Sequence, residues 1–138
     1  MDTTRRWWGG HLLDIPEDEC WDLLAATTVG RIAWCEAGGP VVLPVNIAVH
    51  DGAIWMRTRA HSAMAAHTNH GEIAVQVDEA DEFNRSGWSV LARGHAELVA
   101  YALGPASMGD PDPWPEGARP LLIKLEPSTV TGRRLLAS

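Results

Sequence analysis

The chain has 138 residues, 46% of them hydrophobic, which is enough for a single domain over residues 1–138 that buries roughly two thirds of its unfolded surface. The formal net charge is −7, and the basic residues are ten arginines and one lysine. We therefore expect no nucleic-acid partner, because phosphate neutralisation needs clustered basic residues, and no membrane insertion, because the apolar runs are too short to span a bilayer.

Residues 1–10 contain Arg5-Arg6, Trp7-Trp8 and a glycine pair without any period. We expect a flexible arm, or an arm whose two tryptophans pack on a partner subunit. This end carries no secretory apolar segment, so the sequence predicts a cytoplasmic protein in which Cys20 and Cys35 form no extracellular disulfide.

The first helix is predicted to follow Asp14 and to run through about Ala26. Asp14 stands three residues before Glu17, which is a capping-box arrangement with aspartate in the usual serine or threonine place. The apolar residues that follow have helical spacing and are expected to pack in the core: Cys20, Trp21, Leu23 and Leu24.

Three strands are predicted next, over residues 30–35, 41–49 and 53–58. Asp51-Gly52 between two apolar runs is a strong signal for a tight hairpin, so the second and third of these strands should be antiparallel. The loop at residues 36–40 should likewise join the first strand to the second. Pro44 lies inside the second strand and predicts an edge or an irregular point there, because proline cannot donate to a ladder.

The third strand leads into a candidate anion site. Arg57 and Arg59 are followed by His61 and by Ser62, which is a plausible N-cap for a short helix over residues 62–68. Arginine side chains, a hydroxyl and the unpaired amides of a helix start suit a phosphate group.

Asn69-His70-Gly71 should end this helix. His67 and His70 are three residues apart and could face one way toward a metal ion. No acidic residue or cysteine stands nearby at a recognised ligand spacing, so we expect solvent-exposed histidines and no metal site.

The second half of the chain predicts further strands over residues 72–78, 88–101, 121–126 and 130–135. Gly94 inside the longest run indicates a bulged or strongly curved strand, as closure of a barrel requires. Residues 78–86 should form a loop. Residues 102–120 hold five prolines and should form an extended loop. The result is a mostly β, antiparallel barrel with short helices; no βαβ alternation or GxGxxG turn indicates a Rossmann fold.

Several short motifs together resemble the family of pyridoxamine 5′-phosphate oxidase, the flavin-binding split β-barrels. They are Pro44-Val45-Asn46, Asp51-Gly52, Arg57-Thr58, His61-Ser62-Ala63, Gly87-Trp88-Ser89-Val90, Arg93-Gly94 and the closing Val130-Thr131-Gly132-Arg133-Arg134-Leu135. The resemblance covers nearly the whole chain. It implies an antiparallel split β-barrel that forms a homodimer, with FMN in the groove between the subunits.

The resemblance also implies a role for each matching residue. Arg57, Arg59 and Ser62 would bind the FMN phosphate, with a smaller contribution from His61. The usual lysine of the phosphate loop is replaced by Ala63, so the arginines would have to supply its charge.

The strand through Pro44 would border the flavin ring. The residues expected around the ring are the main-chain groups of Val45, Asn46 and Thr58, with Trp88 and Ser89 flanking it, and Arg133 on the substrate side. Without the resemblance, Pro44 would be an ordinary edge-strand proline and Trp88 a large core residue.

Three functions remain open at this point. The first is an FMN-dependent oxidoreductase that acts on a small organic substrate, since the flavin would supply the chemistry and no nucleophile motif is present. The second is a reductase that uses the related deazaflavin coenzyme on the same fold. The third is a non-catalytic protein that holds a flavin, haem or another planar ligand, which the loss of the lysine at Ala63 keeps open.

Overall fold

The computed structural model describes residues 11–59, 62–108 and 120–136. The arm predicted at residues 1–10 lies outside the described residues, as do His61 and most of the loop predicted at residues 102–120. The elements, in chain order, are β1 (His11–Ile15), α2 (Glu17–Ala26), β2 (Val29–Glu36), β3 (Gly39–His50), β4 (Ala53–Arg59), α3 (Ala63–Thr68), β5 (Gly71–Asp81), β6 (Ser86–Ala100), the 3-10 helices η1 (Tyr101–Leu103) and η2 (Ala106–Met108), and β7 (Pro120–Leu136).

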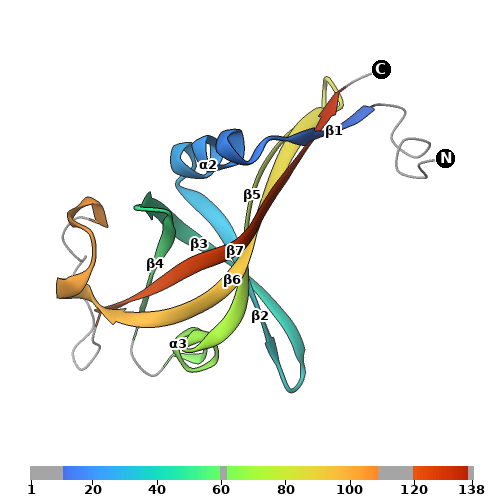
Figure 1. Cartoon of the computed structure of the whole chain (residues 1–138). Helices are drawn as coiled ribbons and strands as arrows, with labels where there is room; N and C mark the ends of the chain where they lie inside the picture. The colour runs from blue at the N-terminus through green and yellow to red at the C-terminus, as the bar shows by residue number, and fades with distance from the viewer. Residues whose placement is uncertain (1–10, 60–61, 109–119, 137–138) are drawn as a thin grey trace.

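The strands form one antiparallel sheet in the order β1-β7-β4-β3-β2-β5-β6, and an additional pairing of β6 with β7 closes it into a barrel. Strand β1 lies outside this ring, against the C-terminal half of β7. Helices α2 and α3 lie at opposite ends of the barrel (Figure 1). The predicted antiparallel barrel with short helices is confirmed.

The Asp51-Gly52 turn joins β3 to β4 as predicted. Both residues have positive φ, 49° and 72°, which is the conformation that a type I′ hairpin turn requires. The turn fixes the register, with His50 opposite Ala53 and Ile47 opposite Met56.

The end of the chain is one strand and not the two predicted at residues 121–126 and 130–135. Strand β7 runs unbroken through Pro127, which lies opposite Gly94 where the β6–β7 register shifts. A proline is compatible with a strand at such a bulge, because no ladder hydrogen bond is required of it there. The bulge that Gly94 predicted is therefore also what lets β7 continue.

The β5–β6 turn and the N-cap of α2 also differ from the predictions. The loop predicted at residues 78–86 is only a short turn, because β5 extends to Asp81 and β6 begins at Ser86. Asp14 does not cap α2; it belongs to β1, opposite Arg133. The N-cap of α2 is Pro16, which makes no side-chain capping bond.

The main core fills the inside of the barrel. Its largest fully buried members include Leu24 of α2, Ile32, Met56, Val75 and Leu125. In β2, buried residues alternate with more exposed ones, and Gly30, Ile32 and Trp34 are the buried set. In β4 the first four residues are all buried, because segment 101–108 covers part of its outward face. Alternate residues therefore point inward to this core or outward from the barrel.

A second, smaller cluster lies on the outside of the barrel. Residues 101–108 cover part of the outward face of β4 and β7, where Met108 and Tyr101 pack with Trp55 and Leu122. Segment 101–108 thus gives these two strands a local cover on their outer side.

The two cysteines are both free thiols, Cys20 buried and Cys35 exposed. Burial, reinforced by neighbouring carboxylates, raises the pKa of the Cys20 thiol. Cys20 has no exposed surface and packs in the main core, and a raised pKa favours the protonated thiol over the reactive thiolate. None of the helices in the described part of the chain is long and apolar enough to cross a membrane.

The bulge at Gly94 gives a stability prediction. A Cβ at this position would lie 2.4 Å from the Glu126 carbonyl oxygen and 2.8 Å from both Pro127 Cα and Ser128 N. These are backbone atoms of β7, so Gly94→Ala should lower the free energy of unfolding by about 1–3 kcal/mol in urea denaturation. Gly38→Ala is the control, because a Cβ there meets no atom within 4 Å; equal losses in the two variants would contradict the prediction.

The β5–β6 turn gives a pH prediction. The Asn84 backbone N–H, then its side-chain amide, bond the carboxylate and hold the pKa of Asp81 below its usual value. Because the pKa of Asp81 is lower in the folded than in the unfolded state, the two hydrogen bonds to its carboxylate stabilise the fold. This stabilisation is present above the unfolded pKa and is lost as pH falls through the folded pKa. Asn84→Ala should raise the Asp81 pKa in an NMR titration. The free energy of unfolding should then fall less steeply as the pH is lowered. An unchanged Asp81 titration would show that the side-chain bond has no effect.

Candidate functional site

Strands β3 and β4 separate where the sequence predicts the cofactor site. Their ladder runs from His50 opposite Ala53 to Ile47 opposite Met56 and then stops. Beyond that point, β3 continues as a partner of β2 alone, while β4 continues along β7 up to Arg59. We call this divergence the split; the elements that border it are shown in Figure 1.

The split divides the predicted residues between the two faces of the strands. Ile47 and Met56, the last ladder pair, are both buried in the core. Alternation then points Asn46 and Arg57 outward, on either side of the split. Pro44 and Arg59 also point outward, and both are exposed. Val45 and Thr58 point inward, and Thr58 is 6% exposed.

The same register decides which main-chain groups face the split. The Ile47 N–H donates to the carbonyl oxygen of Thr28, the residue before β2, at 2.9 Å. Ile47 and Thr28 are therefore a hydrogen-bonded pair that continues the β2–β3 ladder by one residue. Hydrogen-bonded pairs alternate along an antiparallel ladder, which directs the main-chain groups of Val45 to β2 and those of Asn46 toward the split. Pro44 has the same orientation as Asn46 and has no N–H to leave without a strand partner. The main-chain amides of Val45 and Asn46 were both predicted to face a ligand. The register directs only the amide of Asn46 toward the split.

Segment 101–108 holds the Arg57 side chain in place on the outer face. The Arg57 guanidinium donates through Nη2 to the Met108 carbonyl oxygen and lies over the Tyr101 ring, 5.7 Å from its centroid. The Tyr101 hydroxyl donates to the same carbonyl oxygen at 3.2 Å. No local pattern in the sequence indicates this contact, because Arg57 and Met108 are 51 residues apart.

Thr58 and Ser62 link the end of β4 to α3. Their hydroxyl oxygens are 3.0 Å apart, and Ser62 Oγ accepts the Ala65 N–H at 3.0 Å, which confirms the predicted N-cap. Ala63 is exposed in the first turn of α3. The Ser62 hydroxyl is therefore already bonded on two sides, and a ligand would compete for it.

Ser89 and Arg133 lie together at the other end of the barrel. They are paired across β6 and β7, and both point outward. Strand β6 adjoins β5 and β7, not β3 or β4. Leu121 of β7 pairs with Ala100 of β6 on one side and with Thr58 of β4 on the other. Ser89 lies eleven residues before Ala100 along β6, which is about 36 Å of extended strand. One chain does not bring Ser89 and Arg57 together.

Trp88 points to the opposite face from Ser89. It packs partly buried against the core on the side covered by α2. Its β7 neighbour is Arg134, whose guanidinium donates to Glu19 Oε1 of α2 at 2.8 Å. The contacts of Trp88 within one chain are therefore those of a core residue.

The two histidines considered for a metal ion have other neighbours. His67 Nε2 lies 3.4 Å from Glu36 Oε1, which also accepts a hydrogen bond from the Trp34 indole at 3.1 Å. The His70 ring is 6.2 Å from that of His95. Within residues 11–59, 62–108 and 120–136, no group of three histidine, cysteine or acidic side chains could hold a metal ion.

Comparison with known proteins gives consistent matches. The chain is 29% identical over 142 residues to the uncharacterized protein Rv0080 of Mycobacterium tuberculosis, covering 92% of this chain and 88% of that one. The FAD binding protein from Mycobacterium smegmatis superposes with a TM-score of 0.71 at 24% identity, over 90% of this chain and 98% of that one. A putative pyridoxamine 5′-phosphate oxidase from Corynebacterium glutamicum gives a TM-score of 0.69 at 25% identity, over 92% and 95% of the two chains.

The sequence model of the pyridoxamine 5′-phosphate oxidase family matches residues 16–134, from the start of α2 almost to the end of β7. The antiparallel barrel with its split between β3 and β4 agrees with the split-barrel fold of these neighbours. This chain belongs to the pyridoxamine 5′-phosphate oxidase family.

Proposed function

We propose that this protein is an FMN-binding oxidoreductase that acts on a small organic substrate, and that it works as a homodimer. The observation that carries the proposal is the split. Where the β3–β4 ladder ends, it directs the main-chain groups of Asn46 into the opening. Across the opening, Arg57 of β4 points to the outward face. A planar, polar-edged ring with an anionic tail needs such a combination of partners.

The described residues fit the phosphate tail of a flavin. Arg57 and Arg59 are two residues apart at the end of β4, so both side chains point to its outward face. The planar guanidinium group offers paired donors that match phosphate oxygens. The contacts with Tyr101 and Met108 order the Arg57 side chain in advance. Less conformational entropy is then lost when the phosphate binds.

The residues at the split also fit the ring. The main chain at Asn46 faces the opening and can bond the polar edge of a flavin, while the Pro44 ring gives a rigid apolar contact beside it. A bound flavin supplies the redox chemistry, and the protein supplies binding, orientation and exclusion of water. The chain therefore requires no acid, base or nucleophile of its own at this place.

A second copy of the chain would complete the site. Ser89 and Arg133 share the outward face with Arg57 but lie at the other end of the barrel. In a two-fold symmetric dimer, the far end of one subunit can meet the split of the other, and both sites form at once. Val29 and Val42, which point outward from β2 and β3, are 56% and 57% exposed, and burying them would favour such an assembly.

Ala63 gives a reason to test a second function, a protein that holds a planar ligand without turnover. Without the lysine, one charge-assisted contact to the phosphate is missing, which is about 1.5–3 kcal/mol. The M. smegmatis neighbour is named for FAD, so FAD is a further candidate ligand, beside the deazaflavin coenzyme and haem.

The test is an absorbance and fluorescence titration of the purified protein with FMN, and with FAD, the deazaflavin coenzyme and haem in parallel. Saturable binding of one FMN per subunit, tighter than the other three, followed by reduction of the bound flavin with a small-molecule substrate, is the expected result. Tighter binding of FAD, deazaflavin or haem would replace FMN in the proposal. Binding without turnover in a substrate screen would favour the second function.

Removing the guanidinium of Arg57 should weaken FMN binding. Arg57→Ala loses a charge-assisted contact with the phosphate, so the dissociation constant should rise roughly tenfold to a hundredfold. Arg133→Ala, on the substrate side, should change it less. Tyr101→Phe removes only the hydroxyl bond to Met108 and controls for loosening of segment 101–108. Equal FMN affinities of the two arginine variants would refute the phosphate assignment.

Restoring a lysine at position 63 should tighten FMN binding. Ala63 is exposed, so Ala63→Lys can be accommodated, and its ammonium group would add a charge-assisted contact that lowers the dissociation constant roughly tenfold. Ala66→Lys is the matched control, because it adds the same charge to an exposed position of the same helix. If both variants change affinity equally, the loop before α3 does not hold the phosphate.

A further inference from the structure

Phe83, the one phenylalanine of the chain, is 94% exposed in the turn between β5 and β6. The turn is internally fixed: the Asp81 carboxylate accepts the Asn84 N–H at 3.1 Å and the Asn84 side-chain amide at 2.6 Å. A bulky aromatic side chain presented on such a turn is typical of contact with another surface, because aromatic residues are enriched in the cores of protein interfaces.

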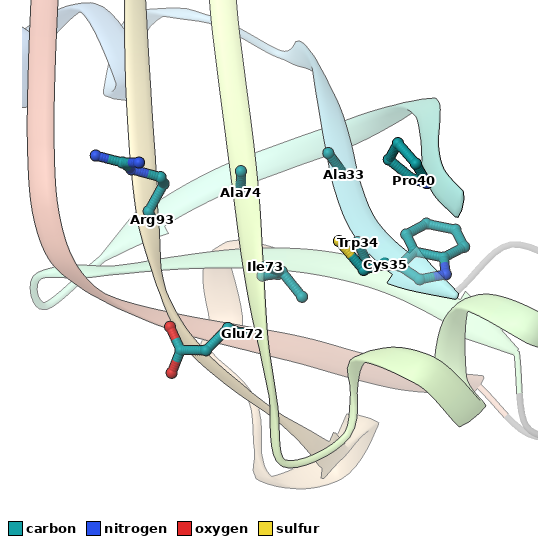
Figure 2. Close-up of a pocket in the computed structure, with 8 residues that line it drawn as sticks. All are labelled: Ala33, Trp34, Cys35, Pro40, Glu72, Ile73, Ala74 and Arg93. Carbon is teal, nitrogen blue, oxygen red and sulfur yellow. The ribbon is translucent and has the colours of Figure 1, made fainter. Parts of the chain in front are cut away.

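The outward face of the barrel carries a hollow that could receive an aromatic ring. Small apolar side chains line it, Ala33, Ala74 and Pro40 among them, together with Cys35, while Glu72 and Arg93 stand at its edge (Figure 2). Its volume is about 260 Å³. A cavity of roughly 150 Å³ is sufficient for benzene, so a phenyl ring fits here by size.

The hollow is out of reach of the Phe83 of its own chain. Ala74, in the hollow, and Asp81, at the turn, are seven residues apart on the same strand, which is about 23 Å of extended chain. An occupant must therefore come from another molecule. The turn carries Glu79, Asp81 and Glu82 and also Arg85. Arg93 and Glu72 stand at the edge of the hollow, so each surface offers charges that can pair with opposite charges on the other.

We propose that Phe83 of each subunit inserts into this hollow on a second copy of the chain. The contact is isologous: a two-fold axis that places one turn on the partner's hollow also places the partner's turn on the first hollow. The edge of the hollow and Ser89 share the outward face of β6, so the docking brings the far end of each barrel onto its partner. This inference rests on the homodimer of the proposed function and names the residues that hold it.

The oligomeric state of the flavin-free protein tests the contact. Sedimentation equilibrium should give a dimer whose dissociation constant rises roughly a hundredfold in Phe83→Ala, because both symmetric anchors are lost together. Ala74→Trp, which fills the hollow from its floor, should act in the same direction. Leu103→Ala is the control, because Leu103 is 78% exposed but lies on neither surface, and it should not change the dimer.

An engineered disulfide tests whether residue 83 docks at the hollow. Phe83→Cys should give, on mild oxidation, a reducible covalent dimer with Cys35, and the additional change Cys35→Ser should abolish it. Leu103→Cys is the control for random collision. Covalent dimers formed equally by the two cysteine variants, or unaffected by Cys35→Ser, would overturn this assignment of the hollow.

The outcomes separate this inference from the flavin proposal. A wild-type monomer, or a dimer that Phe83→Ala leaves unchanged, overturns the docking, whatever the FMN titration gives. A dimer that depends on Phe83 but binds no flavin supports the docking and refutes the flavin proposal alone.

Discussion

The fold depends on the backbone pairing of β7 with three strands at once. Its first half joins β4 to β6, and its second half joins β6 to β1. Main-chain groups at a strand edge need partners or solvent, so one strand with ladders on both sides removes two edges from the sheet. The bulge opposite Gly94 gives β7 the bend that barrel closure requires.

The split follows from this constraint. Strand β4 is drawn along β7, while β3 stays on β2, so the two strands of the hairpin diverge after Ile47 and Met56. An edge inside a closed barrel is costly unless its polar groups are bonded. Pro44 reduces that cost because it has no N–H, and a polar ligand at Asn46 would reduce it further. The feature that defines this fold is therefore also the natural place for its ligand.

The arrangement of the outward face has a consequence for assembly. Arg57 lies near one end of the barrel, and Ser89 with Arg133 lies near the other. Under the proposed homodimer, each ligand site combines the two ends of different subunits, so cofactor binding and subunit association stabilise one another. Segment 101–108 would then order one wall of the site before the partner arrives.

The sequence by itself determined the features that depend on local chemistry. These are the Asp51-Gly52 turn, the Ser62 cap, the alternation of the strands and the glycine bulge, and its short motifs indicated the family. Only the tertiary structure decided that β7 is continuous, that β1 is a strand, that Asp14 caps nothing and that Met108 holds Arg57. These features depend on pairings between residues far apart in the chain, and local propensity carries no information about such partners. The residues of the candidate site were visible in the sequence, but their separation onto two faces and two ends of the barrel was not, because register and strand order set it.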